Sequence, residues 1–117
     1  MNEILKNVYL GGTVDAGHLK MEGNVDFVPV DARCIIDRHN TSKQNLEGCR
    51  MLASVIHMIV ISGKKALVFC GGGSERSALV VAYYWSVVES WPDFDEIFET
   101  MKDKRECVRN CQSWIGK

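Results

Sequence analysis

A short apolar run, a glycine-rich turn and a longer apolar run follow one another without interruption between residues 66 and 85. The first run, 66–69, has the length of a strand, and the second, 78–85, continues as a helix. A strand that passes through a tight glycine turn into a helix directs backbone N–H groups, and the positive end of the helix dipole, into the turn. The stretch therefore predicts an anion-binding loop at the end of a buried, central strand.

Three side chains with suitable chemistry lie in or beside this turn. Cys70 opens the turn, and Arg76 and Ser77 close it. The N–H groups that would hold an anion also stabilise a thiolate, so the Cys70 thiol is expected to ionise easily. The Arg76 guanidinium can bind a phosphate through two parallel hydrogen bonds. The sequence thus predicts a nucleophile and an oxyanion clamp on one loop, with an ordinary buried cysteine as the alternative for Cys70.

The composition is that of an ordinary soluble globular protein. The 117 residues suffice for one domain, 1–117, and 46% of them are hydrophobic and 25% charged. A formal net charge of −1 gives no general attraction to nucleic acid or to an anionic membrane. No apolar run is long enough to span a membrane, and the N-terminus does not resemble a signal peptide. The five cysteines lack the spacing of metal sites or of disulfide frameworks, so we expect reduced thiols, no bound metal, and an intracellular location in the cytoplasm or nucleus.

The remaining patterns predict an α/β fold, a small mixed central sheet flanked by helices. Within the N-terminal helix, Leu19 and Met21 are expected to face inward, and Pro29 favours either an edge position for its strand or a break in it. Thr41 and Gln44 form the sequence pattern of a capping box. The expected elements are a strand at 4–12, a short helix at 13–21, a helix at 42–62, a strand at 66–69, and helices at 77–90 and from 94 onward, the last capped by Asp93. A β-type run at 25–30 and a second short apolar run at 33–37 form either two strands or one bent strand.

The pattern of Cys70, five further residues, Arg76 and Ser77, set between an apolar strand and a helix, resembles the active-site motif of the cysteine-dependent protein tyrosine phosphatases. The short chain is most similar to their compact, atypical dual-specificity branch, and the likeness is firmest over residues 41–90. The resemblance implies a phosphatase that acts on phosphotyrosine, phosphoserine or phosphothreonine of a protein substrate. It also implies that no metal or organic cofactor takes part.

The resemblance assigns a role to each residue of the motif. Cys70 would attack phosphorus as a thiolate, Arg76 would hold the phosphoryl oxygens, and Ser77 would stabilise the departing thiolate. Asp37, 33 residues before the cysteine, would protonate the leaving oxygen, with Asp31 as the second choice. The phosphate-binding positions are expected to be Gly71, Gly72, Gly73, Ser74, Glu75 and Arg76.

Three features depart from the usual family pattern. Phe69 replaces the histidine that normally precedes the cysteine, and Glu75 would repel a phosphate if it faced inward but brace the loop if it faced outward. The segment between the first strand and Asp37 is also short, which implies a reduced or exposed substrate-facing surface. These departures keep two rivals open: a phosphatase-fold module that binds phosphorylated partners with little turnover, and a phosphatase that acts on RNA 5′ ends or on a phospholipid.

The basic side chains near the C-terminus are expected to form a solvated face, with a phosphoprotein-docking patch as the alternative; they are Lys102, Lys104, Arg105 and Arg109.

Overall fold

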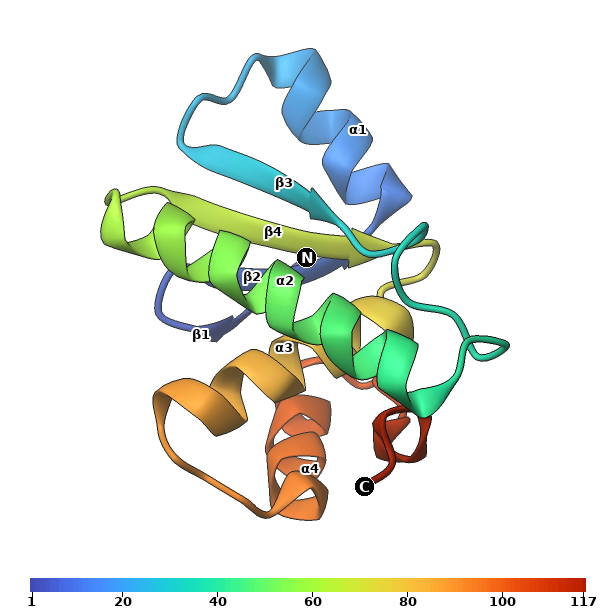
Figure 1. Ribbon diagram of the computed structural model, residues 1–117. Coiled ribbons are helices and arrows are strands. Elements are labelled where there is room, and N and C mark those ends of the chain that lie inside the picture. Colours follow the sequence, from blue (N-terminus) through green and yellow to red (C-terminus); the bar gives the residue numbers. More distant parts are fainter.

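A computed structural model describes residues 1–117 and contains a four-stranded sheet in the order β1-β2-β4-β3 (Figure 1). β1 runs antiparallel to β2, whereas β2 and β3 both run parallel to β4, so the sheet is mixed, as predicted. The elements are β1 (Asn2–Leu5), β2 (Val8–Gly12), α1 (Thr13–Glu22), β3 (Phe27–Asp31), α2 (Ser42–Ile61), β4 (Lys65–Cys70), α3 (Arg76–Val88), α4 (Phe94–Lys104) and the 3-10 turn η1 (Gln112–Ile115).

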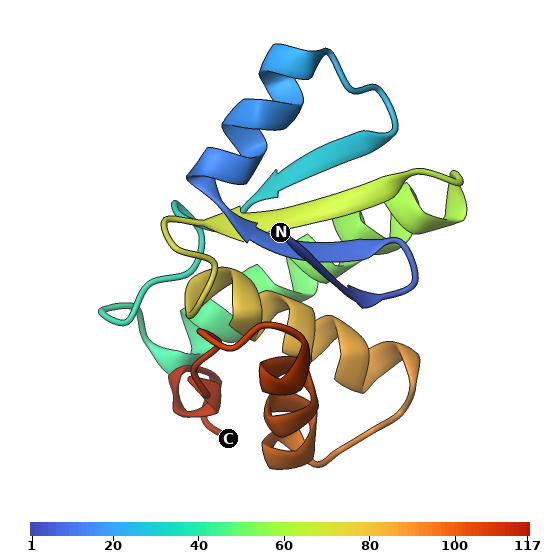
Figure 2. The same cartoon turned by 180° about the vertical axis from the view of Figure 1, so that it is seen from behind.

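Helices cover both faces of the sheet, as Figures 1 and 2 show from opposite sides. α1 alone packs on one face, against β2 and β4. α2 and α3 pack on the other face, and α4 lies outside them against α3 and β1. None of the helices is both long enough and apolar enough to cross a membrane. The predicted α/β class, with a small mixed sheet between helices, is confirmed.

β4 is an inner strand of the sheet, paired with β2 on one side and β3 on the other, and both of its faces are buried. Ala66 and Val68 face the main core beneath α2 and α3. Leu67 and Phe69 face the opposite way and form a smaller apolar cluster with Leu19 of α1. Because neither face of this strand meets water, its sequence is apolar without interruption, as expected for a strand inside a sheet.

Three predictions for the N-terminal third are wrong. Residues 4–12 belong to two strands rather than one, because Asn7 takes a left-handed conformation (φ 65) that turns the chain into a hairpin. Met21 is 86% exposed, because α1 rests on the sheet through a narrow face that Leu19 occupies. Residues 33–35 form a turn and residues 36 and 37 have no regular structure, so the second apolar run is not part of a strand.

The predicted edge position and helix ends are confirmed. β3, which contains Pro29, pairs only with β4 and so forms an edge of the sheet. At the start of α2, the amide of Gln44 donates to Oγ1 of Thr41 (3.1 Å), and the amide of Thr41 donates to Oε1 of Gln44 (2.9 Å). Asp93 caps α4 by accepting a hydrogen bond from the amide of Glu96 (3.2 Å). These local patterns therefore set the helix ends that the sequence predicts.

The buried side chain of Asn45 ties the loop after β3 to α2. Its Oδ1 accepts from the amide of Asp37 and from Nδ2 of Asn40, both at 3.1 Å. Its Nδ2 donates to the carbonyl of Asp37 (2.9 Å) and to that of Trp114 (3.1 Å). One amide group thereby holds the loop and the C-terminal turn together.

We expect Asn45→Ala to lower the free energy of unfolding by about 2 kcal/mol, because buried backbone groups lose their partners. Urea unfolding followed by circular dichroism measures this change. Lys43→Ala, an exposed substitution on the same helix, is the control and should change stability by less than about 0.5 kcal/mol. Equal losses in the two variants would contradict the role assigned to Asn45.

Candidate active site

β4 ends at Cys70 and α3 begins at Arg76, so residues 71–75 form the loop between them. Cys70 is 3% exposed and Ser77 is fully buried, so both lie at the base of this loop. The Sγ atom of Cys70 and the Oγ atom of Ser77 are 3.1 Å apart, within hydrogen-bond distance. The structure therefore brings together the thiol and the hydroxyl that the sequence analysis singled out.

The surroundings of Cys70 favour its thiolate. Burial alone raises the pKa of the Cys70 thiol, since a charge is costly away from water. The Ser77 hydroxyl, followed by the backbone N–H groups of Ser77, Gly73 and Glu75, outweighs burial and lowers the pKa of the Cys70 thiol below its usual value. Peptide N–H groups of the loop and of the start of α3 thus favour ionisation of this thiol.

The Arg76 side chain turns back over the same loop. Its Nη2 atom lies 3.6 Å from the point that a Cβ on Gly71 would occupy. Its Nη1 atom donates to the carbonyl oxygen of Arg33 at 3.2 Å. The guanidinium therefore lies between the loop and the segment that follows β3. The Arg76 guanidinium thus lies beside Gly71, the residue that directly follows Cys70.

The loop rests on the end of β2, in contacts that leave no space for larger residues. Gly73 has φ +69, and a Cβ there would lie 2.5 Å from the carbonyl oxygen of Gly11. A Cβ on Gly12 would lie 2.7 Å from the carbonyl oxygen of Gly71, and the amide of Thr13 donates to that same oxygen at 3.2 Å. From sequence alone, Gly11 and Gly12 mark only the end of a strand. They contact the loop because β2 pairs with β4, and this pairing cannot be predicted from the residues next to the two glycines.

Arg105, at the end of α4, holds the outer side of the loop. Its Nη2 donates to the carbonyl of Gly72 and its Nε to that of Gly73, both at 3.0 Å. The amide of Arg109 donates to the carbonyl of Ser74 at 2.8 Å. In a planar trans peptide the N–H of the next residue points the opposite way. These outward carbonyls therefore turn the following N–H groups toward the loop interior.

The expectation that the C-terminal basic residues form a solvated face is wrong for Arg105. Its side chain is half-buried and also donates from Nη1 to Oδ1 of Asn2 (2.8 Å). It thus connects the loop, β1 and the end of α4. No signal within its own segment distinguishes Arg105 from its basic neighbours, because each of its partners comes from elsewhere in the chain.

The two departures from the usual motif lie outside the loop interior. Glu75 faces the C-terminal segment, with Oε2 3.9 Å from Sγ of Cys111. Burial, followed by the Glu75 charge, raises the pKa of the Cys111 thiol to about 11. Phe69 lies on the face of the sheet that α1 covers, away from α2 and α3, in the apolar cluster with Leu19. Glu75 therefore takes the outward of the two orientations considered from sequence.

The two candidate aspartates lie at the end of β3 and in the loop between β3 and α2. Asp31 ends β3 beside Phe69, and its carboxylate is held by Arg33, with Nη2 to Oδ2 at 2.7 Å. The hydrogen bonds from Arg33, with a smaller effect of Arg76, hold the pKa of the Asp31 carboxyl below its usual value. The backbone of Asp37 is bound by Asn45, while its carboxylate makes no hydrogen bond. No group of three or more His, Cys, Asp or Glu side chains could hold a metal ion.

We expect Arg105→Ala to raise the pKa of Cys70, because the loop N–H groups lose the contacts that aim them at the sulfur. Alkylation of Cys70 at a series of pH values, followed by mass spectrometry of the labelled peptide, measures that pKa. Ser77→Ala removes a direct hydrogen bond and should also shift the curve to higher pH. Lys102→Ala, an exposed substitution on α4, should leave the curve in place. A curve for Arg105→Ala that overlays the wild type would refute the bracing role.

Comparisons with known proteins bear on the fold. No family model matches the sequence, and no curated protein matches it. The structure resembles that of human DUSP28, with 15% identity over 97% of this chain and 86% of that chain and a TM-score of 0.74. It also resembles human tyrosine phosphatase-like serine/threonine/tyrosine-interacting protein (17% identity, 98% and 90% coverage, TM-score 0.72) and Cydia pomonella PTP-2 phosphatase (19% identity, 97% and 84% coverage, TM-score 0.69). Similarity at this level of identity establishes architecture, and this chain has the fold of the compact dual-specificity branch of the cysteine-dependent protein tyrosine phosphatases.

Proposed function

We propose that the chain is one phosphatase domain, residues 1–117, which hydrolyses phosphotyrosine, phosphoserine or phosphothreonine in proteins. The observation that carries this proposal is the Ser77 hydroxyl 3.1 Å from the Cys70 sulfur, at the base of a loop that Arg76 flanks and whose backbone N–H groups lower the pKa of the thiol. A buried structural cysteine has no need of such contacts, and burial alone would have kept it protonated. The dual-specificity phosphatase fold supports the same conclusion.

In the first step, the Cys70 thiolate attacks the phosphorus atom of a phosphomonoester. A sulfur–phosphorus bond forms, and the bond between phosphorus and the leaving oxygen breaks. Arg76 and the N–H groups of residues 71–76 bind the equatorial oxygens, where they stabilise the charge of the transition state. The general acid, Asp37, gives its proton to the leaving oxygen. The products of the step are the free hydroxyl and a phosphocysteine.

In the second step, a water molecule attacks the phosphocysteine. Asp37, now a carboxylate, removes a proton from that water as the new oxygen–phosphorus bond forms. The sulfur–phosphorus bond breaks, inorganic phosphate is released, and the sulfur leaves as a thiolate. Ser77, 3.1 Å from the sulfur, donates the hydrogen bond that stabilises it.

The state of the two carboxylates favours Asp37 as the general acid. Arg33 binds Asp31 and keeps it ionised, whereas a general acid must carry a proton when the reaction begins. The Asp37 carboxylate has no partner that it would have to leave before reaching a substrate. Asp31 in turn is suited to fixing Arg33, whose carbonyl positions Arg76.

A second candidate is a module that binds phosphorylated proteins with little turnover. Phe69 favours it, since the usual histidine next to the cysteine is replaced by an apolar side chain that faces away from the loop. One similar structure is that of a phosphatase-like interacting protein. Such a module would use Arg76 and the same loop N–H groups to hold the phosphate, without releasing it.

Turnover of para-nitrophenyl phosphate distinguishes the two candidates. We expect wild-type protein to release nitrophenol and Cys70→Ser to lose at least about a thousandfold in rate, because the nucleophile is removed. Cys107→Ser changes an exposed cysteine and should leave the rate unchanged. A phosphopeptide that binds wild-type protein without release of phosphate would support the binding module instead.

The leaving-group dependence of turnover tests the general acid. We expect Asp37→Asn to slow the hydrolysis of a phenyl phosphate with a poor leaving group about a hundredfold, with little effect on an activated one, because only the former requires protonation. The ratio of the two rates, measured in parallel for Asp31→Asn, is the matched comparison. If Asp31→Asn alone shows this selective loss, Asp31 is the acid.

A further inference from the structure

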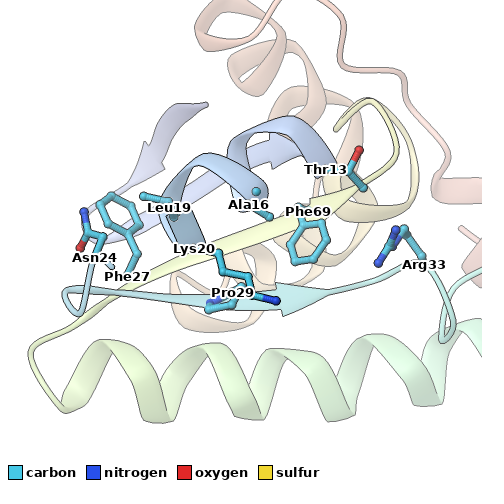
Figure 3. A pocket seen from close by; sticks show the side chains of 10 residues that line it. Thr13, Ala16, Leu19, Lys20, Asn24, Phe27, Pro29, Arg33 and Phe69 are labelled. Atoms are coloured by element: carbon cyan, nitrogen blue, oxygen red, sulfur yellow. The ribbon is translucent and has the colours of Figure 1, made fainter. Parts of the chain in front are cut away.

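A groove of about 600 Å³ lies between α1 and β3, on the face of the sheet that α1 only partly covers (Figure 3). The rings of Phe69, Phe27 and Pro29 form its apolar surface, while Ala16 and Leu19 line it from α1. An edge contact with Tyr9, at 4.9 Å between ring centroids, supports the Phe27 ring. The groove is thus formed by side chains that regular elements hold in place.

One end of the groove adjoins the candidate active site. Thr13, at that end, donates its amide hydrogen to the carbonyl of Gly71 in the loop. Arg33 has two contacts: its carbonyl accepts from Arg76, and its guanidinium lies 5.4 Å from the centroid of the Phe69 ring. Phe69 itself directly precedes Cys70. Figure 3 shows Thr13 and Arg33 at this end and Asn24 and Phe27 at the other.

The charged side chains of the groove favour an acidic ligand. Only two ion pairs form within the chain, from the N-terminus to Asp15 and from Arg33 to Asp31, so Lys20 has no acidic partner. Figure 3 shows Lys20 extending from α1 toward β3. A free ammonium group beside an apolar surface suits an occupant that has both an apolar side chain and a carboxylate.

We propose that this groove binds the residues next to the phosphorylated side chain of a peptide substrate, and that it selects an apolar residue together with an acidic one. The proposal rests on the proposed phosphatase function and specifies its substrate class. With the phosphate in the loop, the adjoining chain enters the groove beside Phe69. Its apolar side chain packs on Phe69 and Phe27, and its carboxylate pairs with Lys20.

A peptide suits the groove better than a lipid does. Polar groups occur along its length, from Thr13 through Lys20 to Asn24, whereas an acyl chain would require a continuous apolar surface. The formal net charge of −1 also gives the protein no general attraction to an anionic membrane.

Gly17 offers a way to fill the groove without disturbing the fold. It lines the groove, lies in the exposed part of α1, and has no atom within 4 Å of the point that a Cβ would occupy. Gly17→Trp therefore adds a large ring to open space. Gly17→Ala is the matched control, because it leaves the groove open and favours the same helix.

The experiment measures kcat/KM on a phosphotyrosine peptide library in which each flanking position is varied in turn. We expect wild-type protein to prefer an apolar and an acidic residue near the phosphotyrosine. Gly17→Trp should lower kcat/KM for the preferred peptide about tenfold, the effect of losing one buried side chain. It should leave kcat/KM for para-nitrophenyl phosphate unchanged, as should Gly17→Ala for both substrates. Lys20→Glu should remove the preference for the acidic residue alone.

Equal use of all peptides by wild-type protein, or the same preference in Gly17→Trp, would overturn the proposal while leaving the phosphatase function in place. So would a preference for a phospholipid in micelles that Gly17→Trp abolishes, because the groove would then hold an acyl chain. If no phosphate is released from any substrate, the Kd of a fluorescently labelled phosphopeptide, measured by anisotropy for each variant, tests the groove independently of turnover. A tenfold weaker Kd in Gly17→Trp than in Gly17→Ala would support the groove even though the phosphatase function had failed, and equal Kd values would refute it.

Discussion

The orientation of the peptide groups in the loop 71–75 is the constraint on which the site depends. A buried thiol is costly to ionise, and the Ser77 hydroxyl together with the backbone N–H groups around the sulfur outweighs that cost and lowers the pKa of Cys70. Each inward N–H requires the preceding carbonyl to point outward, where it too needs a partner. Arg105 and the amide of Arg109 provide those partners. The chemistry of the loop interior therefore depends on hydrogen bonds made outside it.

Much of the remaining architecture serves this arrangement. β4 delivers Cys70 from the middle of the sheet, where neighbours on both sides prevent the strand from shifting. The end of β2 supports the loop through contacts so close that only glycine fits at Gly12 and Gly73. α3 begins directly at Arg76, so its N-terminus adds positive potential to the same place. The sheet, the loop and the start of α3 thus all contribute to the surroundings of Cys70.

The short segment between β2 and α2 has a different consequence. It contains one helix and one strand, so β3 is left as an edge and α1 covers the sheet incompletely. From sequence, the shortness of the chain between the first strand and Asp37 implied a reduced or exposed substrate-facing surface. The structure has a groove between α1 and β3, and its apolar surface includes Phe69, the residue at the position of the family's usual histidine. The same substitution that removes a polar neighbour from the cysteine supplies a ring to the groove.

The sequence by itself determined the strand–loop–helix around Cys70, the central position of β4, the edge position of Pro29 and the capping of α2 and α4. Each of these follows from residues that lie within a turn or two of one another, so local spacing contains the information. Only the tertiary structure decided the hairpin at Asn7, the exposure of Met21, the orientation of Glu75, the contacts of Arg105 and the groove beneath α1. These depend on which segments meet: Arg105 reaches Gly73 across 32 positions of the chain, and no local pattern encodes that meeting.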